Sequence, residues 1–325
     1  MGDAAGIGPE IVVKALSEKE VYTICRPIVI GDLSVLKDVL KVARVNLSFN
    51  PIIKVSEAAF HHGVVDILDL KNIDLARLVM GKPQAMSGKA SVEYVEKAVE
   101  LALRGEVHAI ATAPLSKEAM NLAGYRYPGH TELLAHLTGA EEYSMMLVAG
   151  SLRVIHVTTH VSMSEAVRLI KKERVLATIR LADGALKSLG VKSPRIAVAG
   201  LNPHAGESGL FGMEEIDEIS PAVHKARDLG MDVQGPLPPD TVFLRAKRGE
   251  FDIVVAMYHD QGHIPIKMEG FERGVNVTIG LPIIRTSVDH GTAYRRAGLR
   301  LGTADPTSMI EAIKLAAQMA NQKLG

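Results

Sequence analysis

Short apolar segments alternate with longer amphipathic segments along the chain, and this alternation constrains the fold more than any other feature. Segments such as 196–200 and 251–257 are short and mostly apolar, which is typical of strands buried on both faces of a sheet. Stretches such as 91–105 place their apolar residues on one helical face. Strands alternating with helices predict an α/β fold with a mainly parallel sheet that is covered on both faces.

The same pattern predicts the remaining elements and the number of domains. Further strands are expected at 27–31, 108–112, 144–148 and 152–157, and further helices at 164–189, 214–229 and 306–323. The best linker candidates are 124–129 and 267–274. A chain of 325 residues indicates two domains, at roughly 100–200 residues per domain.

Composition excludes several classes of protein. The 37 basic and 37 acidic residues balance, so neither a nucleic-acid partner nor an anionic membrane bound through bulk charge is expected. No apolar run approaches the roughly 18 residues of a membrane span. One cysteine excludes a disulfide framework and a multi-cysteine zinc site, and together with a start unlike a signal peptide it predicts a cytoplasmic protein.

Three histidines, His160, His204 and His259, each follow an apolar strand closely. Ligands of parallel α/β sheets bind at the carboxyl ends of strands, so three imidazoles arriving there suit a divalent metal with open positions for substrate. Any one of them alone would more often cap its strand by bonding a loop carbonyl. The shared placement of all three favours the metal site.

Polar residues lie near these histidines. Asp260 directly follows His259, and Asp240 follows the stiff, proline-rich segment 235–239. A solvated loop is the alternative interpretation for both.

His130 and Thr131 open an expected helix, where a threonine serves as a cap or helps to present backbone N–H groups to an anion.

Lys267, Asn276 and Arg285 recur at intervals of nine residues, between and within short apolar runs. They predict a clamp for a carboxylate or phosphate, since charged hydrogen bonds to such groups are strong. A solvated loop again remains the alternative.

Six segments together resemble motifs of the 4-hydroxythreonine-4-phosphate dehydrogenase family. They are GDAAGIGPE (2–10), ATAPLSKEAM (111–120), PGHTELLA (128–135), GLNPHAGESGLFG (200–212), MYHDQGHIPIK (257–267) and GVNVTIGLPIIRTSVDHGTA (274–293). The motifs run from end to end, and the last three are long and specific.

The resemblance implies the fold of isocitrate and isopropylmalate dehydrogenases, with two α/β/α domains and an active-site cleft between them. We expect the first domain to comprise 1–125 and 268–325, and the second to comprise 126–267 with most metal ligands and the dimer interface. A homodimer is implied, in which a residue of the partner completes each metal site, and we expect His259 to be the residue that reaches across while His204 stays in its own subunit. By motif, the ligands are His160, His204 and His259, binding one divalent ion (Zn, Co, Ni, Fe or Mn) per subunit.

The resemblance also implies a reaction, the metal-dependent, NAD- or NADP-linked oxidation of a 4-phosphorylated 3-hydroxy acid, with decarboxylation. Substrate contacts carry over to His130, Thr131, Lys267, Asn276 and Arg285. Asp240 and Asp260 match acids that the family places beside the reacting centre, where a carboxylate relays a proton.

Two branches of the family differ in substrate. Segments 259–265 and 129–135 look more like the branch that oxidises 4-phospho-D-threonate or 4-phospho-D-erythronate than the branch that oxidises 4-phosphohydroxy-L-threonine for pyridoxal phosphate synthesis. Three histidines that activate water would instead make a metal-dependent hydrolase, and a catalytically silent metal-binding dimer is a further alternative.

The segment 290–298 resembles the adenosine-binding loop of isocitrate and isopropylmalate dehydrogenases. The cofactor contacts that it implies are His290, Gly291, Thr292, Arg295 and Arg296. Two arginines favour the 2′-phosphate of NADP over the 2′-hydroxyl of NAD, because guanidinium groups bind a phosphate dianion strongly. Solvated arginines at a helix start are the alternative.

Overall fold

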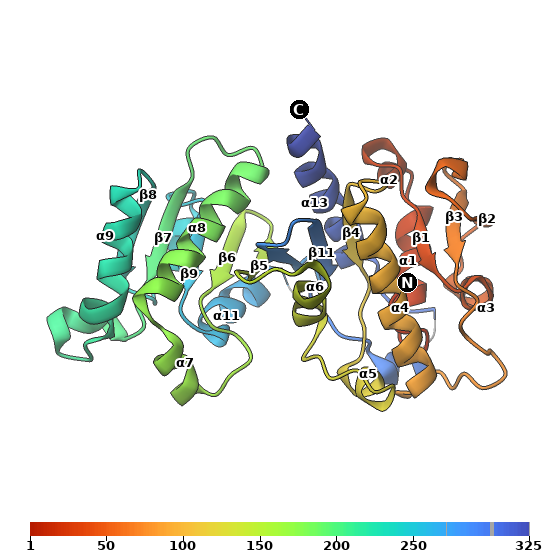
Figure 1. The fold of residues 1–325 in the computed structure, drawn as a ribbon, viewed down its shortest axis with the longest axis horizontal. Helices are drawn as coiled ribbons and strands as arrows, with labels where there is room; N and C mark the ends of the chain where they lie inside the picture. The colour runs from red at the N-terminus through yellow and green to blue at the C-terminus, as the bar shows by residue number, and fades with distance from the viewer. Residues whose placement is uncertain (271, 300–301, 325) are drawn as a thin grey trace. The chain divides into compact units, whose positions relative to one another are not determined.

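The computed structural model describes residues 1–270, 272–299 and 302–324, which form two compact units (Figure 1). Unit 1 comprises Met1–Ala140 and Leu281–Ala320, and unit 2 comprises Glu141–Gly280 and Asn321–Gly325. The boundaries expected after residues 125 and 267 lie inside these units rather than at their edges.

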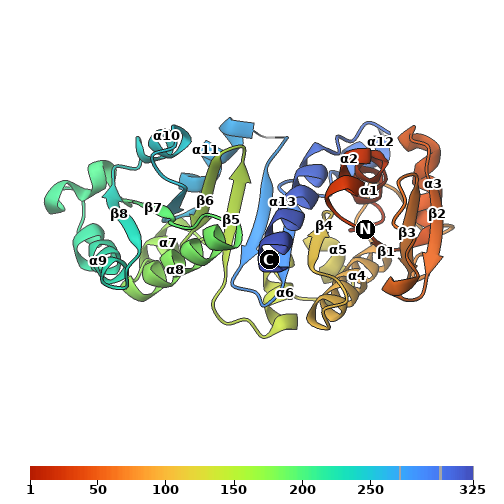
Figure 2. The same ribbon diagram turned by 90° about the horizontal axis from the view of Figure 1, so that it is seen from above.

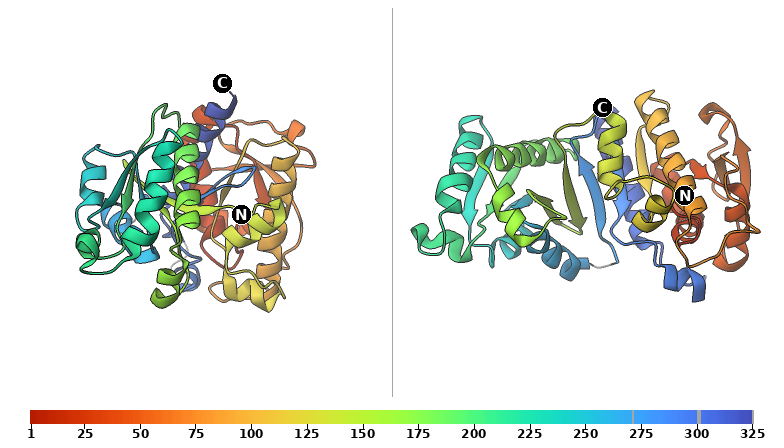
Figure 3. Two further views of the ribbon diagram at one scale, coloured as in Figure 1. Left: turned by 60° about the vertical axis from the view of Figure 1, so that its left-hand side comes forward. Right: turned by 60° about the horizontal axis from the view of Figure 1, so that its bottom comes forward.

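Unit 1 contains parallel strands and the helices that pack on them. Its elements are α1 (Gly8–Ser17), α2 (Lys19–Ile24), β1 (Val29–Gly31), α3 (Leu33–Ala43), β2 (Ser48–Ile52), η1 (Val55–Glu57), β3 (Val64–Asp69), α4 (Ala85–Leu103), β4 (Ala109–Thr112), α5 (Lys117–Leu122), α6 (His130–Thr138), β11 (Ile284–Val288), α12 (Tyr294–Leu299) and α13 (Thr307–Leu324), the last through Ala320. Three strands form a parallel sheet in the order β1-β3-β2, and β4 pairs parallel with β11. Helix α4 packs against β1, β4, α5 and α6. The helix can be found by its orange-yellow colour in both turned views of Figure 3.

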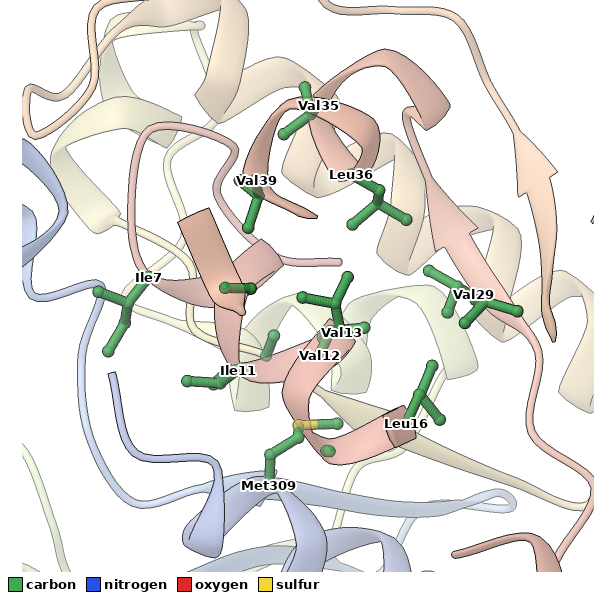
Figure 4. Close-up of a cluster of buried hydrophobic side chains, with 14 of the residues drawn as sticks. Ile7, Ile11, Val12, Val13, Leu16, Val29, Val35, Leu36, Val39 and Met309 are labelled. Carbon is green, nitrogen blue, oxygen red and sulfur yellow. The ribbon is translucent and has the colours of Figure 1, made fainter. Parts of the chain in front are cut away.

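Side-chain caps begin α3 and α5 of unit 1, and apolar side chains pack its helices together. The Asp32 carboxylate caps α3 by accepting the N–H groups of Ser34 and Val35, and Ser116 caps α5. The apolar faces of α1 and α3 meet in a buried cluster that includes Ile11 and Leu36 (Figure 4).

Unit 2 is built on one twisted sheet. Its elements are β5 (Ser144–Ala149), β6 (Leu152–His156), α7 (Met163–Leu169), α8 (Lys172–Ser188), β7 (Arg195–Ala199), the turn η2 (Pro203–Gly209), the π-helix η3 (Glu215–Ile219), α9 (Ser220–Asp228), β8 (Asp232–Leu237), α10 (Val242–Lys247), β9 (Ile253–Ala256), α11 (His259–Gly270) and β10 (Val275–Ile279). The strand order is β10-β5-β6-β9-β7-β8. Strands β6, β9, β7 and β8 are mutually parallel, while β5 is antiparallel to both β10 and β6.

Helices cover both faces of this sheet. Helix α8 contacts β6, β7 and β9, and α9 contacts β8, whereas α10 and α11 contact strands from the other side (Figure 2). Strand β9 is buried at every residue, as its apolar run predicts. The predicted α/β class with a mainly parallel sheet is therefore confirmed.

Several predicted elements differ in detail. The expected helix 164–189 divides into α7 and α8, because the Glu218 carboxylate accepts the N–H of Lys172 and starts a new helix there. The linker expected from Lys267 is wrong over its first residues, since α11 continues to Gly270. Leu133 and Leu134 of α6 join the apolar cluster around α4, which places this helix in unit 1. No helix within the described ranges is long and apolar enough to cross a membrane.

Candidate active site

Three neighbouring strands of unit 2 lead to the three expected metal ligands. Strands β6, β9 and β7 lie side by side and run parallel, so their carboxyl ends share one edge of the sheet. His160 follows β6, His259 follows β9 and His204 follows β7. The sheet therefore brings the strand ends that precede these histidines to the edge where ligands of such folds bind.

His160 and His259 lie close together at this edge. Their ring centroids are 5.5 Å apart, and the ring planes are inclined by 49°. His259 is the first residue of α11, and its Nδ1 lies 2.6 Å from Oδ1 of Asp260. A proton shared in this contact fixes the Nδ1–H tautomer and leaves Nε2 of His259 as the electron-pair donor.

His204 stands apart from this pair. It lies on the turn η2, and its ring neighbours that of Phe211 at a centroid distance of 6.2 Å. Among residues 1–270, 272–299 and 302–324, no three His, Cys, Asp or Glu side chains gather into a metal-binding group. The structure thus brings together two of the three expected ligands within one chain, and this pair includes His259, the residue that we expected to reach across from the partner.

The pair itself has the donor chemistry of a divalent metal site. Two imidazoles 5.5 Å apart are compatible with one shared tetrahedral ion, because each metal–nitrogen bond is about 2.0–2.1 Å long. The Asp260 carboxylate on the distal nitrogen of His259 is the usual outer support of such a ligand. Imidazole donors favour Zn, Co, Ni or Fe over Mg or Ca.

The two expected catalytic acids have different surroundings. Asp240 is exposed on the turn between β8 and α10. Asp260 is also exposed, but its carboxylate contacts His259. Asp260 is thus in contact with an expected metal ligand, whereas Asp240 is exposed to solvent.

Unit 1 holds a buried cation. Arg285 lies on β11 with 2% of its surface exposed, and its Nε and Nη2 donate to Oγ1 of Thr112 at 3.1 and 2.7 Å. Burial lowers the pKa of Arg285 to about 9, and Glu132 opposes this shift. The guanidinium therefore stays charged at neutral pH although it is buried, and a buried cation of this kind is suited to binding an anion.

His130 and Thr131 are the first two residues of α6, and both are half-buried. Burial, with the positive charge of Arg285 as a further cause, holds the pKa of His130 well below its usual range. The structure thus associates His130 with Arg285, and a neutral His130 both donates and accepts hydrogen bonds.

Lys267 and Asn276 lie in unit 2. Lys267 is half-buried near the end of α11, and Asn276 lies on β10 with its Nδ2 2.9 Å from Sδ of Met145. The buried Oδ1 of Asn276 has no hydrogen-bond partner within the described part of the chain. An orphaned buried acceptor of this kind fits a residue that awaits a ligand donor.

The expected cofactor segment begins with His290, Gly291 and Thr292. The carbonyl of Thr292 accepts the N–H of Ile7 at 3.0 Å, which ties the segment to the glycine-rich start of the chain. A Cβ added to Gly291 would meet nothing within 4 Å, so space is open in front of this backbone.

Arg295 and Arg296 occupy the first turn of α12 and are exposed. The neighbouring Tyr294 hydroxyl donates to Oδ2 of buried Asp3 at 2.7 Å, which anchors the helix. Two exposed guanidinium groups beside open backbone are compatible with a bound phosphate. Their cofactor contacts stay a prediction.

Sequence reasoning missed three residues next to the site. His263 packs on His259, His156 packs on His263, and the buried Glu215 binds the chain just before His204. Extending the helix from His259 would have revealed His263, since residues four apart share a helical face. The sequence pattern presents Glu215 only as an acid of a first helical turn.

Comparison with known proteins covers nearly the whole chain. Residues 23–316 match the family model described as pyridoxal phosphate biosynthetic protein PdxA. D-threonate 4-phosphate dehydrogenase of Salmonella typhimurium is 53% identical over 321 residues, which cover 98% of this chain and 97% of that protein. 4-Hydroxythreonine-4-phosphate dehydrogenase of Desulforapulum autotrophicum is 49% identical, covering 98% and 94%.

A solved structure gives the same result in three dimensions. The crystal structure of a 4-hydroxythreonine-4-phosphate dehydrogenase from Burkholderia phymatum is 52% identical and covers 98% of this chain and 96% of that one, with a TM-score of 0.86. A match of this extent in both sequence and fold shows common descent along almost the entire chain. The chain therefore belongs to the PdxA family.

Proposed function

We propose that this chain is a dehydrogenase that oxidises the 3-hydroxyl of 4-phospho-D-threonate or 4-phospho-D-erythronate with NAD or NADP as acceptor, and that the resulting β-keto acid loses carbon dioxide. The observation that carries the proposal is 53% identity over 321 residues to an enzyme named D-threonate 4-phosphate dehydrogenase. The charged groups of the site support an anionic substrate.

Recognition of the substrate's anionic groups rests on two sets of residues. In unit 1, the buried guanidinium of Arg285 would bind an anionic end, with neutral His130 and Thr131 donating further hydrogen bonds. In unit 2, Lys267 would add a second positive charge, and Oδ1 of Asn276 would accept a substrate hydroxyl.

The pair of His160 and His259 would hold a divalent ion, with His204 supplied by a second copy of the chain in a homodimer. When bound, the ion would polarise the substrate hydroxyl, and a nicotinamide would accept the hydride. Through its contact with Nδ1 of His259, Asp260 would keep Nε2 of the same ring available as an electron-pair donor to the ion. Asp240 would accept the hydroxyl proton and pass it to solvent, because its carboxylate is exposed.

The test is an absorbance assay for reduced nicotinamide with metal-loaded protein. We expect a signal with 4-phospho-D-threonate or 4-phospho-D-erythronate and none with the unphosphorylated acids. Absence of any signal with all phosphorylated substrates, while a phosphatase or esterase substrate is hydrolysed, would replace the dehydrogenase by a metal-dependent hydrolase.

A second substrate is supported by a specific observation. One relative that is 49% identical is named 4-hydroxythreonine-4-phosphate dehydrogenase. The two substrates differ at the 2-position, a hydroxyl in one and an amine in the other. The ratio of kcat/KM for 4-phosphohydroxy-L-threonine and 4-phospho-D-threonate, measured in the same assay, decides between them.

A further inference from the structure

The turn that carries His204 has an unusual backbone. Five consecutive residues, 204–208, have positive φ values between 44° and 80°, and only one of them is a glycine. Residues other than glycine rarely adopt this left-handed backbone conformation, because their Cβ atom approaches the following carbonyl oxygen. Such a run persists only where surrounding contacts hold it.

Glu215 supplies such contacts immediately before the turn. One carboxylate oxygen, Oε1, accepts the backbone N–H groups of Leu201 and Asn202, each at 2.7 Å. The other oxygen, Oε2, accepts a hydrogen bond from Nδ2 of Asn202 at 2.8 Å. Asn202 then begins the turn, since its carbonyl accepts the N–H of Ala205 at 3.1 Å.

The turn also closes around this carboxylate. Added Cβ atoms would lie 3.1 Å from Oε1 at Gly200 and 2.7 Å from Oε2 at Gly206. Two glycines are therefore needed for the backbone to approach Glu215 from both ends of the segment. Glu215 itself is 2% exposed and is the first residue of the π-helix η3, a rare element that is frequently found at functional sites.

We propose that Glu215 is a positioning residue that holds the left-handed turn and thereby fixes where His204 stands. The inference rests on the proposed function in so far as His204 is a metal ligand. A buried carboxylate that accepts three N–H groups holds its partners more firmly than a neutral group, because hydrogen bonds to a charged acceptor are stronger.

The first experiment measures metal affinity. Full-length protein is stripped of metal, and the Kd for Co²⁺ is measured by competition with a chelator in the native protein, Glu215→Gln and Asp217→Asn. The amide nitrogen introduced by Glu215→Gln would face donor N–H groups, so we expect this variant to raise Kd by about 10- to 100-fold, the range typical for lost outer-shell partners. Asp217 is exposed on the same π-helix, and its amide variant is expected to stay within about twofold.

The second experiment measures the turn directly. Amide hydrogen exchange of Leu201 and Asn202 is compared in the metal-free proteins, with Gly206→Ala as a second variant that presses a methyl group towards Glu215. We expect faster exchange in Glu215→Gln and Gly206→Ala and unchanged exchange in Asp217→Asn.

The outcomes separate this inference from the proposed function. A native protein that binds no divalent ion would remove the metal from the proposed function, and the exchange rates alone would then judge whether Glu215 holds the turn. A lowered Tm with unchanged Kd and unchanged exchange at Leu201 and Asn202 would overturn the inference, because Glu215 would then act on global stability only.

Discussion

The imidazole of His263 lies flat against that of His259, with ring centroids 3.6 Å apart and ring planes inclined by only 11°. The two residues are four positions apart on α11 and therefore share one face of the helix. Nδ1 of His263 donates to the His259 carbonyl at 2.9 Å, and the buried His156 also packs on His263, at a centroid distance of 4.7 Å. The ring of His259 is thus fixed by His263 on its face and by Asp260 at its Nδ1.

This stack predicts a dependence of metal affinity on ring shape. We expect His263→Ala to raise the Kd for Co²⁺ about tenfold, the lower end of the range for outer-shell contacts, because His259 gains rotational freedom. His263→Phe keeps a flat ring and should stay close to the native value. His224→Ala, at an exposed histidine of α9, is the control. Equal losses in the alanine and phenylalanine variants would argue against stacking as the cause.

The buried guanidinium predicts a kinetic defect. Arg285→Lys should lower kcat/KM by about ten- to hundredfold, because a lost charged hydrogen bond costs about 1.5–3 kcal/mol and lysine lacks the planar fork. The measurement is steady-state kinetics with 4-phospho-D-threonate, with Arg248→Lys on the surface as the control. An unchanged kcat/KM would exclude Arg285 from substrate binding.

Shared metal sites predict complementation between inactive chains. If His204 reaches the pair of His160 and His259 from a second copy, then mixing His204→Ala with His259→Ala should restore partial activity, because one site of each mixed dimer has all three imidazoles. Subunit exchange is verified with two distinguishable tags. No recovery after verified exchange would mean that all three ligands come from one chain.

The exposed arginines of α12 predict the cofactor preference. The native enzyme should accept NADP at least as well as NAD, and Arg295→Asp should shift the ratio of kcat/KM towards NAD, because a carboxylate repels the 2′-phosphate and accepts the 2′-hydroxyl. Arg248→Asp controls for net charge. A native enzyme that strongly prefers NAD, with no shift in Arg295→Asp, would show that Arg295 does not contact the cofactor.

The depressed pKa of His130 predicts a loss of stability in acid. The unfolded chain binds a proton at about pH 6.5, whereas the folded chain does so only at lower pH, so the free energy of unfolding falls as pH drops below 6.5. One such group contributes at most about 1.4 kcal/mol per pH unit. Urea unfolding of metal-free protein between pH 7.5 and 5 should show a smaller decline in His130→Phe than in His136→Phe, a variant at an exposed position of the same helix. Equal declines would contradict the shift.

Sequence patterns alone establish the α/β class and the strands that carry the site. Apolar runs such as Ile253–Ala256 lie in the centre of the sheet, and this is readable because burial on both faces requires a continuous apolar segment. Three histidines after three strands also place the candidate site at one sheet edge, because parallel strands end at the same edge.

The contacts of the site's side chains, by contrast, emerge only in the folded chain. The sequence does not indicate that His160 lies beside His259, or that Glu215 binds the chain before His204, because these contacts join residues far apart along the chain. The left-handed run at 204–208 runs against the local preference of four non-glycine residues, so only the surrounding contacts explain it. Local periodicity fixes which face of an element is buried, whereas the orientation of a polar side chain depends on partners that only folding brings together.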